Sequence, residues 1–116
     1  MNFIVKGEIS IETECGIKIS SKTMKLFGLV KKTGALNTAA RELGMSYSHA
    51  WNTVYKINCQ LNHPLVVTRR GGKGGGIAYL TPEGEELLKS FTALQKEIRR
   101  LIKSTGINDK KTSLSA

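Results

Sequence analysis

Hydrophobic and polar residues alternate near the start of the chain. Ile9, Ile11 and Thr13 fall on one side of an extended segment, and polar residues fall on the other side. The chain then turns at residues 14–16, and the apolar alternation resumes at Ile17. This pattern predicts a β-hairpin.

After residue 20 the apolar spacing changes to three and four residues. Met24, Phe27 and Val30 share one face of a predicted first helix, which starts at a pair of serines and stops at Gly34. A short second helix is predicted next, closed by Gly44. We expect Asn37 or Thr38 to cap it. Its apolar residues are Leu36, Ala39, Ala40 and Leu43.

A third helix is predicted to begin at Ser46 and to continue through "YSHAWNTVYKINCQL", until His63 and Pro64 end it. The short glycine-containing turn before it gives the outline of a helix-turn-helix. One face of this helix is predicted to pack in the core, and it carries Tyr47, Ala50, Trp51, Val54, Ile57 and Leu61. The opposite face can form hydrogen bonds, and it carries Ser48, His49, Asn52, Thr53 and Lys56.

Two short runs rich in β-branched and aromatic residues, "LVVTRR" and "IAYLT", flank a glycine-rich stretch. They predict a second hairpin with a basic tip that contains Arg69, Arg70 and Lys73. A nucleotide-binding P-loop needs Gly-Lys-Ser/Thr leading into a helix, but Lys73 is followed by three glycines. Glycine-rich backbone beside basic side chains fits contact with the phosphates or minor groove of a duplex instead.

Thr81, Pro82 and Glu83 predict the start of a long helix over about residues 82–103. Its apolar residues follow a four-three-four-three spacing, which suits packing on its own domain or pairing with a second subunit. They are Leu87, Phe91, Leu94, Ile98 and Leu101. Residues 104–116 lack periodicity, and we expect them to form a flexible tail after a single domain over residues 1–103.

The composition narrows the class of partner. The 116 residues carry a formal net charge of +9, which favours a polyanion such as nucleic acid. No apolar run approaches the roughly 18 residues of a membrane span. Cys15 and Cys59 lie far apart, so we expect reduced thiols in a cytoplasm and no metal site or cofactor.

Together these elements predict a mainly α-helical α+β fold, a winged helix-turn-helix with a glycine-rich basic wing and a long C-terminal helix. In this fold the third helix enters the major groove, where Asn52 can pair with adenine and His49 or Lys56 can donate to guanine. The predicted DNA-binding residues are Ser46, Ser48, His49, Asn52, Thr53, Lys56, Arg69, Arg70 and Lys73.

Three function classes can be compared at this point. The first is a dimeric, sequence-specific DNA-binding regulator, and the second is a protein-interaction module or a non-specific architectural DNA-binding protein. The third is an enzyme, which we do not expect, because the nine acidic residues gather mainly in the first hairpin and at the start of the long helix.

The stretches "TGALNTAARELGMSYSHAWNTVYKIN" and "LVVTRRGGKGGGIAYLTPEGEELL" resemble the N-terminal DNA-binding domain of the ModE family of molybdate-responsive regulators. The resemblance implies a winged-helix transcriptional regulator that forms a homodimer on a pseudo-palindromic operator. Full-length members continue into molybdate-binding domains, whereas this chain ends about a dozen residues after its last predicted helix. We therefore expect a version without a small-molecule effector domain, whose targets concern molybdenum or metal-cofactor genes.

Overall fold

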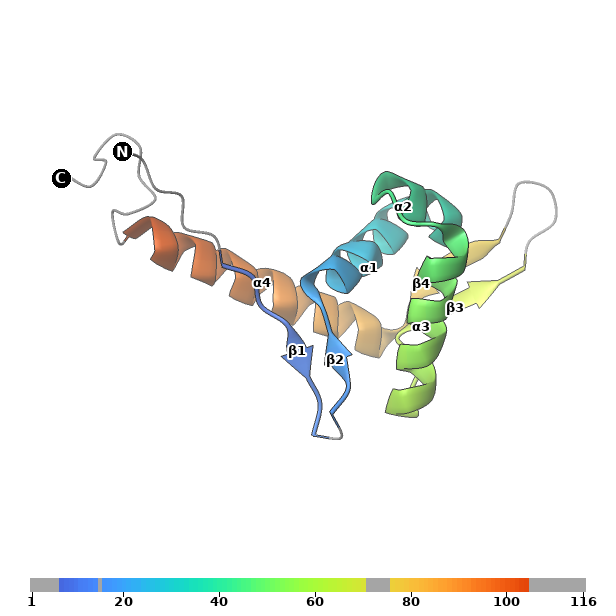
Figure 1. Ribbon diagram of the computed structural model, residues 1–116, viewed down its shortest axis with the longest axis horizontal. Helices are drawn as coiled ribbons and strands as arrows, with labels where there is room; N and C mark the ends of the chain where they lie inside the picture. The colour runs from blue at the N-terminus through green and yellow to red at the C-terminus, as the bar shows by residue number, and fades with distance from the viewer. Residues whose placement is uncertain (1–6, 15, 71–75, 105–116) are drawn as a thin grey trace.

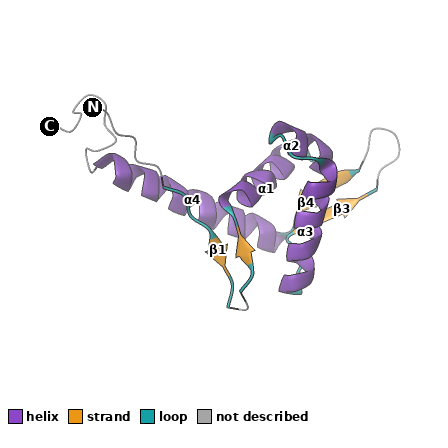
Figure 2. Cartoon of the chain, in the orientation of Figure 1, coloured by secondary structure: helices purple, strands orange, loops and turns teal. Residues whose placement is uncertain are grey.

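The computed structural model describes residues 7–14, 16–70 and 76–104, and helices dominate it (Figures 1 and 2). It is a winged helix-turn-helix, as the sequence predicts. The elements follow in the order β1 Ile11–Glu12, β2 Lys18–Ile19, α1 Ser21–Thr33, α2 Leu36–Glu42, α3 Tyr47–Leu61, β3 Val66–Arg69, β4 Ile77–Leu80 and α4 Pro82–Ser104.

The predicted first hairpin is confirmed. Strands β1 and β2 pair antiparallel, with Ile11 opposite Ile19. Burial alternates along the hairpin as the pattern requires, and Ile19 is fully buried. The hairpin therefore adds its apolar side to the core and leaves its charged side in water.

Helix α1 begins and ends where its capping residues predict. The hydroxyl oxygen of Ser20 accepts a hydrogen bond from the amide of Thr23 at 3.2 Å. Gly34 adopts a left-handed conformation with φ of 75°, and its amide donates to the carbonyl of Val30. The carbonyl of Gly34 in turn accepts a hydrogen bond from the amide of Ala78 in β4, so the end of α1 is joined to the wing.

The predicted cap of α2 is wrong. The helix follows Ala35, which makes no side-chain cap, and both Asn37 and Thr38 lie inside it. Leu36 is buried at the first helical position, so the chain enters the helix before either predicted cap. The amide of Ala35 instead donates to the hydroxyl oxygen of Thr33 at 3.4 Å.

Helix α3 starts after Ser46, whose hydroxyl oxygen accepts a hydrogen bond from the amide of His49. It ends at Leu61, because Asn62 takes a left-handed conformation with φ of 61°. Asparagine tolerates this conformation better than most residues. The predicted helix through "YSHAWNTVYKINCQL" is therefore confirmed, and its end lies directly before His63 and Pro64, at the left-handed Asn62.

One hydrophobic core joins α1, α2, α3, the wing strands and the first half of α4. Its largest fully buried side chains are Phe27, Ile19, Met24, Leu26, Val30 and Val66. The wing strands pair antiparallel from Val66 opposite Leu80 to Arg69 opposite Ile77. The core thus holds the base of the wing beside α3.

Helix α4 is fixed at its start. The hydroxyl of Thr81 accepts a hydrogen bond from the amide of Gly84 at 3.1 Å and donates to the carbonyl of Pro64 at 2.8 Å. The amide of Thr81 donates to the carbonyl of Leu65 at 3.0 Å. The predicted threonine cap is confirmed, and it also ties α4 to the chain that enters β3.

The two halves of α4 have different surroundings. Phe91 in the first half is buried, and the second half extends away from the helix-turn-helix (Figure 1). There the apolar side chains of Leu94 and Leu101 are 53% and 67% exposed. Gln95 donates to the carbonyl of Gly7, which brings the start of the described chain against this half. The predicted tail over residues 104–116 lies outside the described residues, except for Ser104 in α4.

Gly84 and Gly28 form a matched pair for testing how closely α4 packs. A Cβ atom at Gly84 would lie 2.1 Å from the carbonyl oxygen of Leu65, whereas one at Gly28 would meet only the side chain of Leu88 at 3.9 Å. We expect Gly84→Ala to lower the free energy of unfolding by about 1–3 kcal/mol, because backbone must move. Gly28→Ala should raise it by up to about 1 kcal/mol through helix propensity. Urea unfolding followed by circular dichroism measures both, and a neutral Gly84→Ala would contradict the close approach.

Candidate nucleic-acid interface

The exposed face of α3 is the first part of the interface. Ser48, His49, Asn52 and Lys56 are all exposed. Thr53 is half-buried, and its hydroxyl donates to the carbonyl of His49 at 2.8 Å. Four of the predicted α3 residues are thus exposed to solvent. The hydroxyl hydrogen of Thr53, in contrast, is already used in a hydrogen bond within the helix.

Ser46 precedes this face as the cap of the helix. It is exposed, but its hydroxyl oxygen already accepts the amide of His49 at 3.1 Å. The hydroxyl hydrogen can still be donated to another group. Ser46 is therefore available as a donor at the tip of α3.

The prediction that Tyr47 and Trp51 pack in the core is wrong. Tyr47 is 49% exposed and Trp51 39% exposed, and Tyr55 is also exposed one turn further along. The core side of α3 is filled by Ala50, Val54 and Ile57. Residues spaced by four from Tyr47 form a neighbouring stripe, so three aromatic residues flank the polar face.

Within this stripe, the rings of Trp51 and Tyr55 stack with centroids 5.0 Å apart and an angle of 10° between planes. A hydrogen bond with the thiol of Cys59 raises the pKa of Tyr55. A tyrosine is already neutral at physiological pH at its ordinary pKa of about 10, so this shift does not change the charge of the phenol. Cys59 itself is a free, exposed cysteine, and Cys15 lies outside the described residues.

Asn58 is a structural residue that the sequence reasoning missed. Its side-chain amide donates to the carbonyl of Val66 at 2.8 Å, and its side-chain oxygen accepts from the amide of Leu65 at 2.8 Å. Both bonds join α3 to the start of β3. The position of this asparagine was the available signal. It is a polar residue that follows the buried residues Val54 and Ile57 and lies near the end of the helix.

The wing supplies the basic part of the interface. Arg69 ends β3 and Arg70 follows it, and both are exposed. Gly76 lies directly before β4, at the end of the wing strands that leads to the tip, and a Cβ atom there would be 2.5 Å from the carbonyl oxygen of Arg69. Glycine is required at this position because the backbones of the two wing segments approach each other so closely. Lys73 falls outside the described residues.

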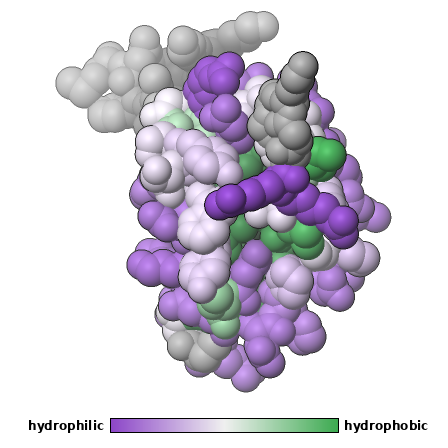
Figure 3. Space-filling model, turned by 90° about the vertical axis from the view of Figure 1, so that its right-hand side faces the viewer, coloured by the Kyte–Doolittle hydropathy of each residue, from purple (hydrophilic) through white to green (hydrophobic). Residues whose placement is uncertain are grey.

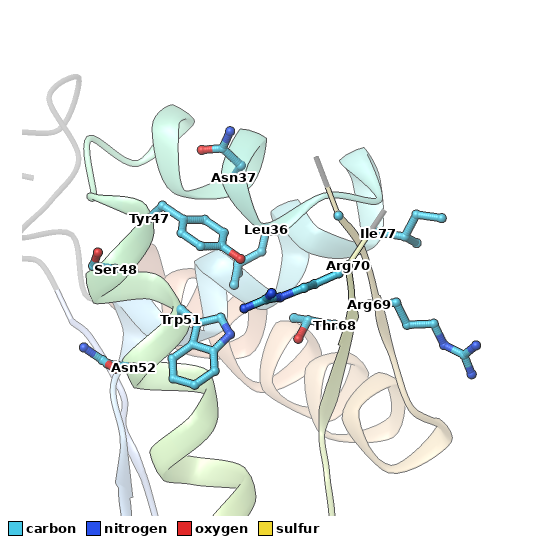
Figure 4. Close-up of a pocket in the computed structure, with 11 residues that line it drawn as sticks. Leu36, Asn37, Tyr47, Ser48, Trp51, Asn52, Thr68, Arg69, Arg70 and Ile77 are labelled. Carbon is cyan, nitrogen blue, oxygen red and sulfur yellow. The ribbon is translucent and has the colours of Figure 1, made fainter. Parts of the chain in front are cut away.

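A cavity of about 720 Å³ lies between α2, α3 and the wing (Figure 4). No acidic side chain is found among the described residues that line it. These residues are Leu36, Asn37, Tyr47, Ser48, Trp51, Asn52, Thr68, Arg69, Arg70, Gly76 and Ile77. The cavity therefore combines basic, amide, hydroxyl and aromatic groups.

Arg70 extends across this cavity toward Trp51, whereas the guanidinium of Arg69 points away from it (Figure 4). Strongly hydrophilic side chains lie beside paler and apolar ones on this end of the molecule (Figure 3). The structure thus brings Ser48, Asn52 and the two arginines together. The predicted residues Ser46, His49, Thr53 and Lys56 do not line the cavity, although they belong to the same end of the protein or the same helix.

The described part of the chain holds no group of three His, Cys, Asp or Glu residues that could bind a metal ion. Among the same residues, none of the helices is long and apolar enough to cross a membrane.

Comparison with known proteins matches the sequence of this region to a family. The model of bacterial regulatory helix-turn-helix proteins of the lysR family matches residues 21–85, which run from α1 into α4.

Several regulators and molybdenum-related proteins are similar in sequence. Molybdenum-pterin-binding protein MopB of Rhodobacter capsulatus is 37% identical over 77% of this chain and 33% of its own length. Molybdenum transport protein ModE of Azotobacter vinelandii is 32% identical over 78% of this chain and 34% of its own length. The DNA-binding transcriptional dual regulator ModE of Escherichia coli is 33% identical over 63% of this chain and 28% of its own length. The chain spans about a third of the length of these relatives.

Two asparagines on α3 provide a test of how the interface is built. Removing Asn58 deletes two hydrogen bonds and leaves backbone groups of Leu65 and Val66 without their partner. We expect Asn58→Ala to lower the free energy of unfolding by about 1–3 kcal/mol. Asn52→Ala should leave it unchanged or slightly higher, because Asn52 is exposed and alanine favours helix. Urea titration compares them, and equal stability of the two variants would rule out the bridging role of Asn58.

Proposed function

This chain belongs to the bacterial regulatory helix-turn-helix proteins of the lysR family, and on that premise we propose that it is a sequence-specific DNA-binding transcriptional regulator. One observation carries the proposal. Ser48 and Asn52 of the exposed polar face of α3 and the two arginines of the wing border one cavity, with no acidic residue among its described lining. A DNA duplex presents base edges, which polar side chains can read, next to phosphates, which arginines can bind.

Each part of the interface has a role in the proposal. Helix α3 lies in the major groove, where Asn52 pairs with adenine and Ser48 contacts a neighbouring base or phosphate. His49 and Lys56 lie further round the helix and donate to guanine or phosphate. Ser46 and Thr53 supply hydroxyl groups at the edges of this face. Arg69, Arg70 and Lys73 bind phosphates and set the position of the protein on the duplex.

The regulated genes form a finer part of the proposal. The names of the relatives refer to molybdenum-pterin binding, molybdenum transport and transcriptional regulation. We propose that this chain acts in the cytoplasm on genes that concern molybdenum or a metal cofactor.

We also propose that two copies pair through α4. Leu94 and Leu101 are exposed on the half of the helix that extends past the core, and Ile98 lies between them. A groove of about 1260 Å³ adjoins this half, and Gly28 and Phe91 are among its lining residues. A second copy would cover these apolar side chains and place two α3 helices on half-sites roughly 34–36 Å apart.

Selection of bound duplexes from a random library, followed by fluorescence anisotropy at several salt concentrations, tests the function. We expect the selected duplex to bind at least ~10³-fold tighter than a shuffled duplex. If about six phosphates are neutralised, the log–log salt slope should be near −5. Equal affinity for both duplexes would indicate a non-specific architectural protein, and no binding would indicate a protein-interaction module.

Asn52→Ala is expected to lower affinity for the selected duplex by about 1–3 kcal/mol and to leave affinity for shuffled DNA nearly unchanged. The reason is that Asn52 reads a base edge and contributes little to phosphate binding. Gln60→Ala is the matched control, because Gln60 is exposed on α3 near its other end. Equal losses on both duplexes would exclude base reading by Asn52.

Leu94→Glu should convert a dimer into a monomer in sedimentation velocity, because the charge enters the proposed apolar interface. The domain should keep its fold, since Leu94 is 53% exposed in the single chain. Lys89→Glu serves as the control, since Lys89 is exposed and faces away from the apolar stripe. A dimer that survives Leu94→Glu would move the interface away from α4.

A further inference from the structure

Three exposed aromatic residues on α3 remain without a role in the polar contacts described above. Tyr47, Trp51 and Tyr55 lie one turn apart along the helix and contribute little to the core. Tyr47 and Trp51 line the cavity between α3 and the wing, and Tyr55 extends the surface by stacking on Trp51. They form a continuous aromatic stripe on the side of α3 that faces the wing.

The surroundings of the stripe indicate what covers it. Arg70 reaches across the same cavity toward Trp51 (Figure 4), and no acidic residue is found in the described lining. The chain carries a net charge of +9. A second copy of the same basic surface would be repelled here, whereas an anionic duplex is attracted.

The position of the stripe on α3 indicates which part of the duplex it meets. A helix with its side chains is about 10–12 Å wide, and the major groove is about 12 Å wide. A helix whose middle faces the bases therefore places both of its flanks within the groove. The stripe forms one flank, directly beside the exposed Ser48 and Asn52.

The major groove offers an apolar side chain one distinctive partner, the C5-methyl group of thymine. Asparagine pairs with adenine, and the methyl group of the opposite thymine lies in the same groove on the same base pair. An aromatic residue beside Asn52 is thus within one base step of such a methyl group. The methyl group and the amide contact would together define an A·T pair.

We propose that the aromatic stripe recognises C5-methyl groups of pyrimidines in the major groove, with Trp51 as the principal contact and Arg70 holding a phosphate beside it. This inference rests on the proposed DNA-binding function. It adds a specificity determinant that does not depend on hydrogen bonds. Burying one methyl-sized group corresponds to roughly a fourfold gain in affinity.

The test uses duplexes that differ only in that methyl group. Alternating A·T duplexes are made with thymine or with uracil, and alternating G·C duplexes with cytosine or 5-methylcytosine. Fluorescence anisotropy at one salt concentration should show at least about fourfold tighter binding to the methylated member of each pair. The G·C pair adds the methyl group to a different base, so a shared preference is not a property of A·T sequence.

Variants assign the preference to the stripe. Trp51→Ala and Tyr47→Ala should bring the methylated and unmethylated affinities together, and thermal unfolding checks that each variant is folded. Tyr47, the more exposed of the two, keeps the test available if Trp51→Ala does not fold. Tyr79→Ala is the control, because Tyr79 is an exposed aromatic residue on β4 that is not part of the cavity lining, and it should keep the preference.

The fluorescence of Trp51 gives a second readout, since it is the chain's only tryptophan. Its emission should change more on binding the thymine duplex than the uracil duplex. Equal wild-type affinity for thymine and uracil duplexes, or a preference that survives both stripe variants, overturns the inference and leaves DNA binding intact. If the protein binds none of these duplexes and none selected from the random library, the proposed function fails as well.

Discussion

The backbone of Leu65 and Val66 is the junction on which the rest of the domain depends. Asn58 of α3 bonds to both residues, and Thr81 bonds to the carbonyl of Leu65 from the start of α4. Gly84 adds a close approach to the same carbonyl, which a side chain at this position would prevent. The hydrogen-bonding groups of a short connecting segment are thereby satisfied by two helices, and α3, the wing and α4 are held in one arrangement.

This junction explains why α3 can have an exposed face without losing its position. Small and medium-sized residues, Ala50, Val54 and Ile57, attach the helix to the core, and Asn58 joins it to β3. The polar residues and the aromatic stripe are then not needed to hold the helix in place. The wing, paired with itself through β3 and β4 and joined to Gly34 at its base, stands beside this face. The groups that we propose to read bases and to bind phosphates are thus carried by different elements, whose relative position is fixed by the core.

Helix α4 combines two tasks along its length. Its first half is capped, closely packed against Leu65, and linked to α1 by the ion pair of Lys31 with Glu85. Its second half presents leucines to solvent in the single chain. A rigid helix that starts in the core and ends outside it transmits the orientation of the domain to whatever covers its far end. Under the proposed dimer, this rigidity would set the distance between the two recognition helices.

Local rules were enough to place most elements from the sequence. Alternation identified the first hairpin, helical spacing and caps placed α1 and α4, and the glycine-rich basic stretch identified the wing, because each signal depends only on neighbouring residues. The order of these elements then indicated the winged helix. The wrong cap of α2 shows the limit, since burial of Leu36 outweighed the preference of Asn37 and Thr38 for a capping position.

What only the tertiary structure decided is which side of each element is covered. Helical spacing alone could not show that Tyr47 and Trp51 lie outside the core, because the covered arc of α3 depends on how α2 and β3 pack against it. Nor could it show that Asn58 is committed to Leu65 and Val66 while Asn52 is exposed, although both are asparagines on one helix. The sequence by itself determined the helices and strands, through local conformational preference. It also determined the positive net charge that favours a polyanion, through composition. Which residues are exposed was decided by the packing of segments that lie far apart in the chain.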